Sequence, residues 1–270
     1  MPRWSAPALA LALLLVASPL AAQTRPLLTE PASTAPAGSL VFETGFDWIS
    51  NERNPVTLAR RTRWEGPLLR FVYSPASNVE LDLEWVVAVG ASSDPDFGST
   101  SGPGDVSLRT KLRFVEETSD RPAVGARVSV TLPETKSLEG LGPDTLRARV
   151  ELLLTRHFGP VGLHGNAGLL IEDLPRDEPE QVDFFTWGVA LEHRLDARFT
   201  ALLEATGRSG PGEPEARSRA EARLGARFDQ KRLAFDFALR RGLSQADGDW
   251  GVTLGLACRV REARATRSSP

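Results

Sequence analysis

Several residue types are scarce in this chain of 270 residues, and each scarcity removes a class of protein. Cys258 is the only cysteine, so no disulfide can form within the chain and zinc sites built from several cysteines are excluded. Beyond the first 22 residues no apolar run approaches about 18 residues, so we expect no transmembrane helix. The formal net charge is only −3, which gives no support to nucleic-acid binding.

The N-terminal region has the pattern of an export signal. Arg3 supplies a positive charge, an apolar run follows over residues 6–16, and Ala21-Ala22 offers a small-residue cleavage site. Residues 1–22 are therefore predicted to be a signal peptide that directs Sec-type export to the periplasm, with no cysteine near the cut for a lipid anchor. Residues 23–38 are rich in Pro, Thr, Ser and Ala, and we expect a flexible periplasmic lead-in too short to form a plug domain.

Alternation of apolar and polar residues is the main signal in the rest of the chain. Residues 79–89 show it most clearly: every odd position is apolar, and Glu80, Asp82 and Glu84 lie between them. A period of two places alternate side chains on opposite faces of a strand. The pattern recurs in twelve segments, approximately 39–49, 67–74, 78–90, 104–115, 122–132, 144–156, 160–172, 182–194, 198–207, 215–228, 232–241 and 249–260.

The connections between these segments are alternately long and short. Longer ones, full of Gly, Pro, Asp and Ser, fall at 49–66, 90–104, 133–143, 172–181, 207–214 and 242–248. Outer-membrane barrels have short periplasmic turns and longer outside loops, and in lipid the sheet must close. We therefore predict an all-β fold: a transmembrane, antiparallel, up-and-down barrel of about twelve strands over residues 39–260, located in the outer membrane of a Gram-negative cell. Residues 261–270 would form a polar basic tail.

Aromatic residues fit this orientation. Some fall near the predicted periplasmic ends of strands and others near the outer ends, as interfacial girdles do: Tyr73, Phe114, Phe158, Phe199 and Phe228 at the first, and Trp48, Phe185 and Trp250 at the second. Aromatics also favour strands in general, so the girdle is an interpretation. A secreted soluble β protein is the alternative, and its apolar rows would then be covered by protein.

The face opposite the apolar rows carries charge and is predicted to line the lumen. Its candidate residues are Glu80, Asp82, Glu84, Arg109, Lys111, Arg113, Arg127, Arg147, Arg149, Glu151, Glu204, Arg219, Glu221, Arg223, Arg227 and Asp236. If the third and fourth strands pair, an acidic row faces a basic row, each opposed pair contributing roughly 0.2–1 kcal/mol. Two readings stay open: a salt-bridge network that holds the barrel shape, or a transverse field that orients a solute. Arg219, Arg223 and Arg227 form either a basic stripe or pairs with Glu204 and Asp236.

Three short motifs resemble a known family. They are Gly104-Asp105-Val106-Ser107-Leu108-Arg109-Thr110-Lys111, Val128-Ser129-Val130-Thr131-Leu132-Pro133-Glu134-Thr135-Lys136 and Gly159-Pro160-Val161-Gly162-Leu163-His164-Gly165-Asn166-Ala167-Gly168. The chain resembles the outer-membrane proteins of the MetA pathway of phenol degradation, although Glu134-Thr135 replaces the usual Thr-Gly after the proline. The resemblance implies a barrel that passes small, often hydrophobic or aromatic, compounds.

These observations predict a passive channel or transporter for small solutes, with no cofactor, no metal and no enzymatic activity. The three histidines, His157, His164 and His193, lie near the predicted periplasmic ends without metal-ligand spacing, which disfavours a lipid-acting barrel enzyme. A non-conducting structural or surface-binding barrel is the other alternative. Expected partners are outer-membrane lipid, lipopolysaccharide, a small solute and the barrel-assembly machinery, with no nucleic acid. Arg60, Arg61 and Arg63 form a basic cluster that either holds lipopolysaccharide phosphates or is simply solvated.

Overall fold

A computed structural model describes residues 25–54, 57–137, 140–173, 181–210 and 218–261. Fourteen strand segments follow one another: β1 (Leu40–Arg53), β2 (Arg60–Ala76), β3 (Val79–Val86), β4 (Val89–Asp94), β5 (Gly98–Gly102), β6 (Val106–Val115), β7 (Ala123–Leu132), β8 (Arg147–Phe158), β9 (Val161–Asp173), β10 (Gln181–Arg194), β11 (Phe199–Ser209), β12 (Arg219–Gln230), β13 (Leu233–Gly242) and β14 (Trp250–Arg261). Among these described residues no helix is long and apolar enough to cross a membrane.

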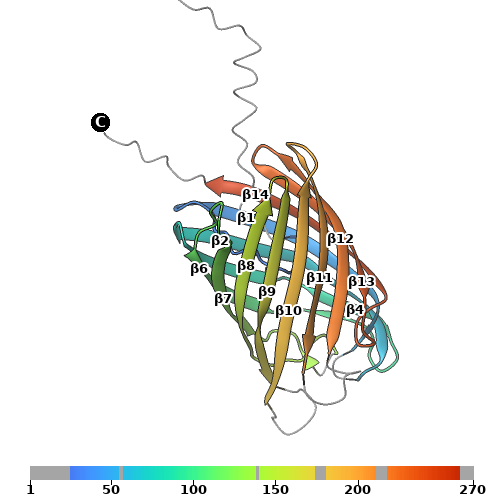
Figure 1. Ribbon diagram of the computed structural model, residues 1–270. Coiled ribbons are helices and arrows are strands. Elements are labelled where there is room, and N and C mark those ends of the chain that lie inside the picture. The colour runs from blue at the N-terminus through green and yellow to red at the C-terminus, as the bar shows by residue number, and fades with distance from the viewer. Residues whose placement is uncertain (1–24, 55–56, 138–139, 174–180, 211–217, 262–270) are drawn as a thin grey trace, which may run out of the picture.

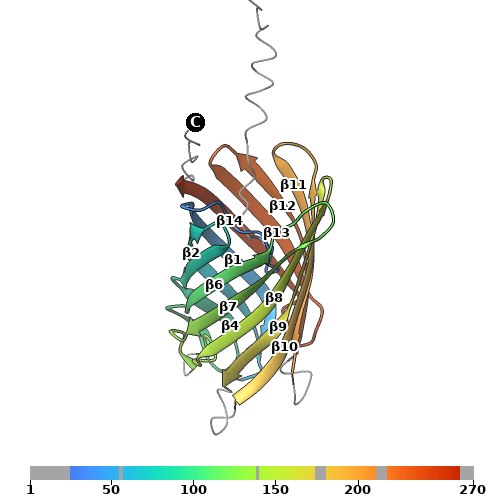
Figure 2. The same ribbon diagram turned by 60° about the vertical axis from the view of Figure 1, so that its left-hand side comes forward.

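The segments close into a barrel of twelve antiparallel strands, two of which are interrupted (Figures 1 and 2). Strand β1 pairs with both β14 and β2, which joins the two ends of the sheet. Strands β3 and β4 pair with successive parts of β2, while β6 pairs with β3 and β5 with β4. Strands β3 and β4 therefore form one interrupted strand of the barrel, and β5 and β6 form another, so the fourteen segments make twelve barrel strands. The predicted all-β, closed antiparallel barrel is confirmed.

Two of the predicted long connections are wrong. The chain continues as paired strand through most of 49–66 and 90–104: β1 runs to Arg53, β2 begins at Arg60, and β4 and β5 form a hairpin joined by residues 95–97. These extensions have few apolar residues on either face. Pairing persists there through backbone hydrogen bonds, which need no apolar alternation, so the sequence pattern stops before the strand does.

The barrel wall is apolar outside and polar inside. On β8, the outward Leu152 is 64% exposed, whereas the inward Glu151 is 5% exposed. Seven of the eight aromatic residues predicted to form girdles are exposed on the outside, from Trp48 at 39% to Phe114 at 63%. The eighth, Phe228, is partly exposed and contacts Phe199 with ring centroids 4.8 Å apart. A soluble monomer seldom exposes so continuous an apolar surface.

The two ends of the barrel differ. We call the end where β1 begins and β14 ends the terminal end, and the opposite end, where β1 turns into β2, the loop end (Figure 1). At the loop end, the connection between β7 and β8 folds inward: Leu141 is fully buried against Leu68, Val86 and Val89. The cluster at Arg60, Arg61 and Arg63 lies in β2, where Arg60 donates to the Gln245 carbonyl oxygen at 2.8 Å and Arg61 to that of Gly140.

Residues 25–38 lie inside the barrel, where the sequence predicted a flexible periplasmic segment. Leu27, Ala32 and Ala35 are each at most 4% exposed, and each joins a buried cluster with residues of the wall. The amino-acid composition of this segment resembles a linker, but its small side chains also fit a confined space, and the wall supplies partners for its backbone. We call residues 25–38 the lumen segment. The predicted signal peptide and residues 262–270 of the tail lie outside the described residues.

Candidate functional site

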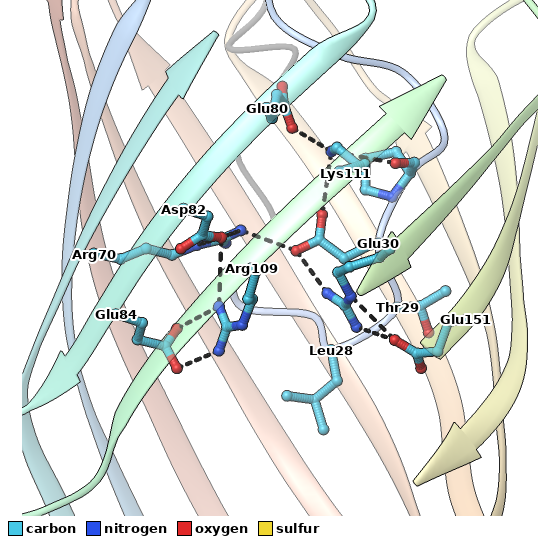
Figure 3. Close-up of polar contacts among 12 residues, drawn as sticks. Leu28, Thr29, Glu30, Arg70, Glu80, Asp82, Glu84, Arg109, Lys111 and Glu151 are labelled. Atoms are coloured by element: carbon cyan, nitrogen blue, oxygen red, sulfur yellow. Dashed lines mark hydrogen bonds and ion pairs between the residues drawn. The ribbon is translucent and has the colours of Figure 1, made fainter. Parts of the chain in front are cut away.

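The centre of the lumen is built around one buried carboxylate of the lumen segment. Glu30 is 2% exposed, and it forms ion pairs with Arg70 at 3.0 Å, Lys111 at 3.3 Å and Arg127 at 3.0 Å. These cations come from β2, β6 and β7, and Figure 3 shows Arg70 and Lys111 extending from the wall toward Glu30. Burying an ion costs several kcal/mol, which close opposite charges must offset. The three cations thus fix the position of the lumen segment.

Inward side chains of the barrel also accept hydrogen bonds from the backbone of the lumen segment. Glu204 on β11 accepts from Leu28 N–H at 2.9 Å and from Thr29 N–H at 2.5 Å. Thr155 Oγ1 accepts from Ala32 N–H at 2.8 Å, and Glu80 accepts from Ala35 N–H at 2.6 Å. An irregular segment has no strand partner for its N–H groups, and buried N–H groups require acceptors. The wall supplies these acceptors.

Asn166 on β9 holds the same segment through its amide. Its amide nitrogen donates to the Glu30 carbonyl oxygen at 3.0 Å, and its amide oxygen accepts from Glu30 N–H at 3.2 Å. Asn166 belongs to the third motif identified in the sequence, and Lys111 to the first. Both motifs therefore contact Glu30, which the sequence did not single out.

The acidic and basic rows of β3 and β6 face each other in the register. Glu80 lies opposite Lys111 and Asp82 opposite Arg109. Lys111 Nζ lies 2.6 Å from a Glu80 oxygen, and Arg109 lies 3.5 Å from Asp82 and also pairs with Glu84. Arg113 lies at the terminal end, where it pairs with Glu116 at 3.4 Å. The rows are joined into a network in which Arg70 bridges Asp82 and Glu30.

The other predicted lumen residues also lie on the inner face. The network around Glu30 continues onto β7 and β8, where Arg127 also pairs with Glu151 at 2.5 Å and Arg149 lies 3.7 Å from Glu151. Arg147 pairs with Asp105.

A second network spans β11 to β13. Arg223 pairs with Glu221 at 2.6 Å and lies 3.8 Å from Glu204, while Arg219 pairs with Glu52 at 3.1 Å. Arg227 pairs with Glu192 at 3.4 Å and lies opposite Asp236 in the register. The sequence proposed that the basic residues of β12 pair with Glu204 and Asp236. Arg223 lies near Glu204 and Arg227 lies opposite Asp236, whereas Arg219 pairs with Glu52 instead.

Sequence reasoning missed several participants. Arg70 lies between Leu69 and Phe71, so the alternation used elsewhere could have identified it. Glu43 between Phe42 and Thr44 is similar, and it lies 3.3 Å from Arg70. Glu30 had no such signal, because the lumen segment has no strand periodicity.

A cavity of about 490 Å³ occupies the part of the lumen toward the loop end. Its lining includes lumen-segment residues from Arg25 to Glu30, and Thr135, Pro143 and Asp247 from the loops. Around Glu30, Glu80 and Lys111, the remaining space is only about 10 Å³, about the room one water molecule needs. The lumen is open on one side of Glu30 and filled beside it.

A carboxylate from the first motif fixes the inward-folded loop at the mouth of this cavity. Asp105 Oδ1 accepts from the backbone N–H groups of Glu134 and Thr135, both at 3.0 Å, and from Thr135 Oγ1 at 2.9 Å. Its other oxygen binds Arg147. Glu134 and Thr135 are the residues that depart from the family pattern in the second motif, and through them Asp105 joins the first motif to the second.

Two of the three histidines make contacts within the chain. His157 Nδ1 lies 2.7 Å from Glu117 at the rim of the terminal end, and His164 Nδ1 lies 2.9 Å from Thr155 Oγ1. Hydrogen bonds from the ring and backbone N–H of His157 lower the pKa of Glu117, although burial acts to raise it. Within the described ranges, no group of three His, Cys, Asp or Glu side chains is arranged to hold a metal ion.

Comparison with solved structures shows a shared fold. The COG4313 outer membrane channel from Pseudomonas putida F1 superposes with a TM-score of 0.68 at 16% identity, covering 84% of this chain and 97% of that one. The NanC porin gives 0.54 at 11% identity, covering 82% and 100%. The translocator domain of the autotransporter NalP from Neisseria meningitidis gives 0.53 at 13% identity, covering 83% and 88%. The fold is therefore that of outer-membrane barrels.

Sequence comparison identifies a family whose activity is not defined. No curated protein matches the chain, and the relation to the MetA-pathway proteins stays a prediction. One family of sequences matches residues 71–260, from β2 to β14, which includes all three motifs. This barrel belongs to the family described as uncharacterised conserved protein UCP029691.

Proposed function

We propose that this protein is an outer-membrane channel through which small solutes diffuse passively. A closed barrel satisfies every strand hydrogen bond within the wall, as a membrane requires, and its outward apolar side chains suit contact with lipid. No cofactor, metal or energy coupling is needed for this role. Lipid and lipopolysaccharide around the wall, and the assembly machinery during insertion, are the partners that such a location implies.

The observation that carries the proposal is the polar cavity of about 490 Å³ toward the loop end. Ligand cavities for small molecules are typically 300–1,000 Å³, so a solute of modest size fits there. A barrel with a purely structural role needs no such cavity. The resemblance to the MetA-pathway proteins adds that aromatic or hydrophobic compounds belong among the solutes to test.

Passage through the whole lumen requires the lumen segment to move. Its residues 25–30 line the inner part of the cavity, and the space beside Glu30 is too small for a solute. The segment is joined to the wall by ion pairs and hydrogen bonds, without covalent links other than its continuation into β1. We infer that the described arrangement is the closed state and that withdrawal of the lumen segment opens the path.

Single-channel recording in planar bilayers tests this function. The refolded mature protein is compared with a variant lacking residues 23–36, and a shift in gel migration on boiling confirms that both are folded barrels. We expect brief or small openings for the full mature chain and a larger, sustained conductance for the shortened one. A folded, inserted barrel that conducts in neither form would contradict the proposal.

A non-conducting barrel is the second candidate, and the filled part of the lumen favours it. The charges of Glu30, Glu80 and Asp82 are matched there by Arg70, Arg109 and Lys111. Such a network can seal a barrel permanently. The shortened variant separates the candidates, since a sealed barrel would still not conduct if the wall residues close the gap by themselves.

A further inference from the structure

We propose that the cavity contains a binding site for small organic carboxylates on the wall formed by β8 to β11, with Arg149 and Arg208 as the anion-binding residues. This site rests on the proposed function, because it defines which solutes the channel would favour. It is built from a surplus of positive charge, an incompletely neutralised arginine and an adjoining apolar surface.

The first step is the charge of the cavity. Eleven arginines line it, against eight aspartates and glutamates. A cavity with low-dielectric walls and a surplus of one sign raises the local concentration of the opposite ion. The surplus lies mainly on one side, where Arg147 and Arg149 extend from β8, Arg208 from β11 and Arg219 from β12.

Arg149 is the least neutralised of the arginines on this side. Its side chain is 37% exposed, compared with 29% for Arg147, 26% for Arg219 and 22% for Arg208. Its nearest carboxylate oxygen, on Glu151, is 3.7 Å away, and the other Glu151 oxygen accepts from Arg127 Nε at 3.0 Å and Nη2 at 2.5 Å. The cross-strand neighbours of Arg149 are Ser129 and Leu170, both uncharged.

Arg208 supplies the second cation and is held in place from two sides. Its guanidinium lies over the buried ring of Phe184, 4.5 Å from the centroid, and it donates to Glu172 at 2.9 Å. Glu172 is on β9, so Arg208 reaches back across β10 toward β8. Arg147, Arg149 and Arg219 are all within electrostatic range of Arg208, and one added carboxylate would relieve this repulsion.

Leu170 supplies an apolar surface between the two arginines. Leu170 lies opposite both Arg149 and Phe184 in the register, and it lines the cavity. Across the cavity, Leu68, Val86 and Val89 also contribute to the lining. Planar guanidinium groups bind carboxylates through paired hydrogen bonds, and the apolar residues suit a small hydrocarbon body. The combination favours an organic carboxylate over an inorganic anion or a neutral sugar.

Ion selectivity and current block by benzoate test the site, with benzamide as the uncharged probe of the same shape. The full mature protein is used, because it retains Glu30 as the partner of Arg70, Lys111 and Arg127. Arg149→Glu is compared with Arg241→Glu. Arg241 makes the matched control because it lies outside the cavity at the rim, paired with Asp249 at 3.9 Å. Both variants change the charge by the same amount.

We expect the unmodified barrel to prefer chloride over potassium and to be blocked by benzoate but not by benzamide. Arg149→Glu should lower the chloride-to-potassium permeability ratio on the order of tenfold at low salt and weaken benzoate block, while Arg241→Glu leaves both nearly unchanged. Cation preference in the unmodified barrel, or equal effects of the two variants, would overturn the site.

A separate measurement distinguishes failure of the site from failure of the channel. If the barrel does not conduct, the thermal midpoint of the folded protein in detergent is measured with benzoate and with benzamide. A benzoate-specific rise that Arg149→Gln abolishes supports the site even without conduction. No difference between the two compounds overturns it.

Discussion

Arginines and carboxylates line both the filled and the open part of the lumen, but they close the first and leave a cavity in the second. Beside Glu30, toward the terminal end, acids and bases alternate closely enough that about 10 Å³ remains between them. Toward the loop end, arginines outnumber carboxylates around about 490 Å³. The difference comes from the lumen segment, which adds Glu30 as a shared carboxylate for Arg70, Lys111 and Arg127. The lumen segment thus separates the filled part of the lumen from the open part.

The comparison also explains why charge inside a barrel does not by itself indicate a pore. A fully paired network is rigid and excludes solutes, whereas an arginine with only a distant carboxylate can bind an ion from solution. Lys111, which contacts Glu80 at 2.6 Å, belongs to the first kind, and Arg149, 3.7 Å from Glu151, to the second.

The largest effect is expected from removing the charge of Glu30, which would make the two parts of the lumen alike. Glu30→Gln leaves three cations without their common carboxylate, and breaking a buried ion pair costs about 3–5 kcal/mol. The lumen segment should leave the wall, raising single-channel conductance toward that of the barrel lacking residues 23–36.

Glu84→Gln is the matched control for Glu30→Gln. Arg109 retains Asp82 at 3.5 Å in that variant, so conductance should change little. Equal effects of the two substitutions would show that Glu30 has no special role in closing the lumen.

A smaller effect is expected at the loop end, where Asp105 fixes the loop that narrows the cavity. Asp105→Ala removes the acceptor of Glu134 N–H, Thr135 N–H and Thr135 Oγ1, and unpairs Arg147. Losing hydrogen bonds to a charged group costs about 1.5–3 kcal/mol each, so the loop should detach while the barrel stays folded. Limited trypsin digestion should then cut after Lys136 faster than in the unmodified protein; unchanged cleavage would count against this anchor.

Thr155→Val tests whether the lumen segment can be loosened in the filled part of the lumen by removing one hydrogen bond without changing any charge. The substitution keeps the side-chain shape but removes the acceptor of Ala32 N–H, and an unsatisfied buried donor costs about 1–3 kcal/mol. Amide hydrogen exchange should increase for residues 32–35 and remain unchanged for Leu28 and Thr29, which Glu204 holds. Uniform acceleration along the segment would mean that it moves as one unit.

The smallest effect is expected at a turn away from the lumen, between β10 and β11. Hydrogen bonds from the backbone N–H groups of Arg198 and Phe199 lower the pKa of Asp196 below its usual value. A depressed pKa means that the stabilisation is present above the ordinary pKa and is lost as the pH falls through the lowered one. Protection of the Phe199 amide should decrease on acidification and be absent at every pH in Asp196→Ala, with conductance unaffected in both cases. Retained protection in the variant would contradict the turn's dependence on this carboxylate.

The sequence predicted the wall well because alternation is a local property. Segments such as Val79 to Val89 show which side chains face outward and which face the lumen. The predicted number of about twelve barrel strands is confirmed. Where the strands extend past the apolar band, as from Arg60 to Arg63, alternation ends while backbone pairing continues, so the predicted boundaries fell short.

The candidate site depended on contacts that the sequence does not encode locally. Glu30 lies in a segment rich in Pro, Thr and Ala, and its partners are 40 to 97 residues away in the chain. Composition therefore indicated a linker, whereas the buried position of the segment arises from acceptors spread over the wall at Glu80, Thr155 and Glu204. The weak neutralisation of Arg149 likewise depends on the strand register, because Arg127 binds Glu151 more closely than Arg149 does.

A reversible crosslink between the lumen segment and the wall tests the central claim most directly. Ala32 N and Thr155 Oγ1 are 2.8 Å apart, so cysteines at these two positions, with Cys258 changed to Ser, should form a disulfide that holds the segment in place. We predict that the oxidised protein does not open in a planar bilayer and that reduction restores openings in the same membrane. Full conductance with the crosslink formed would show that the segment does not close the lumen.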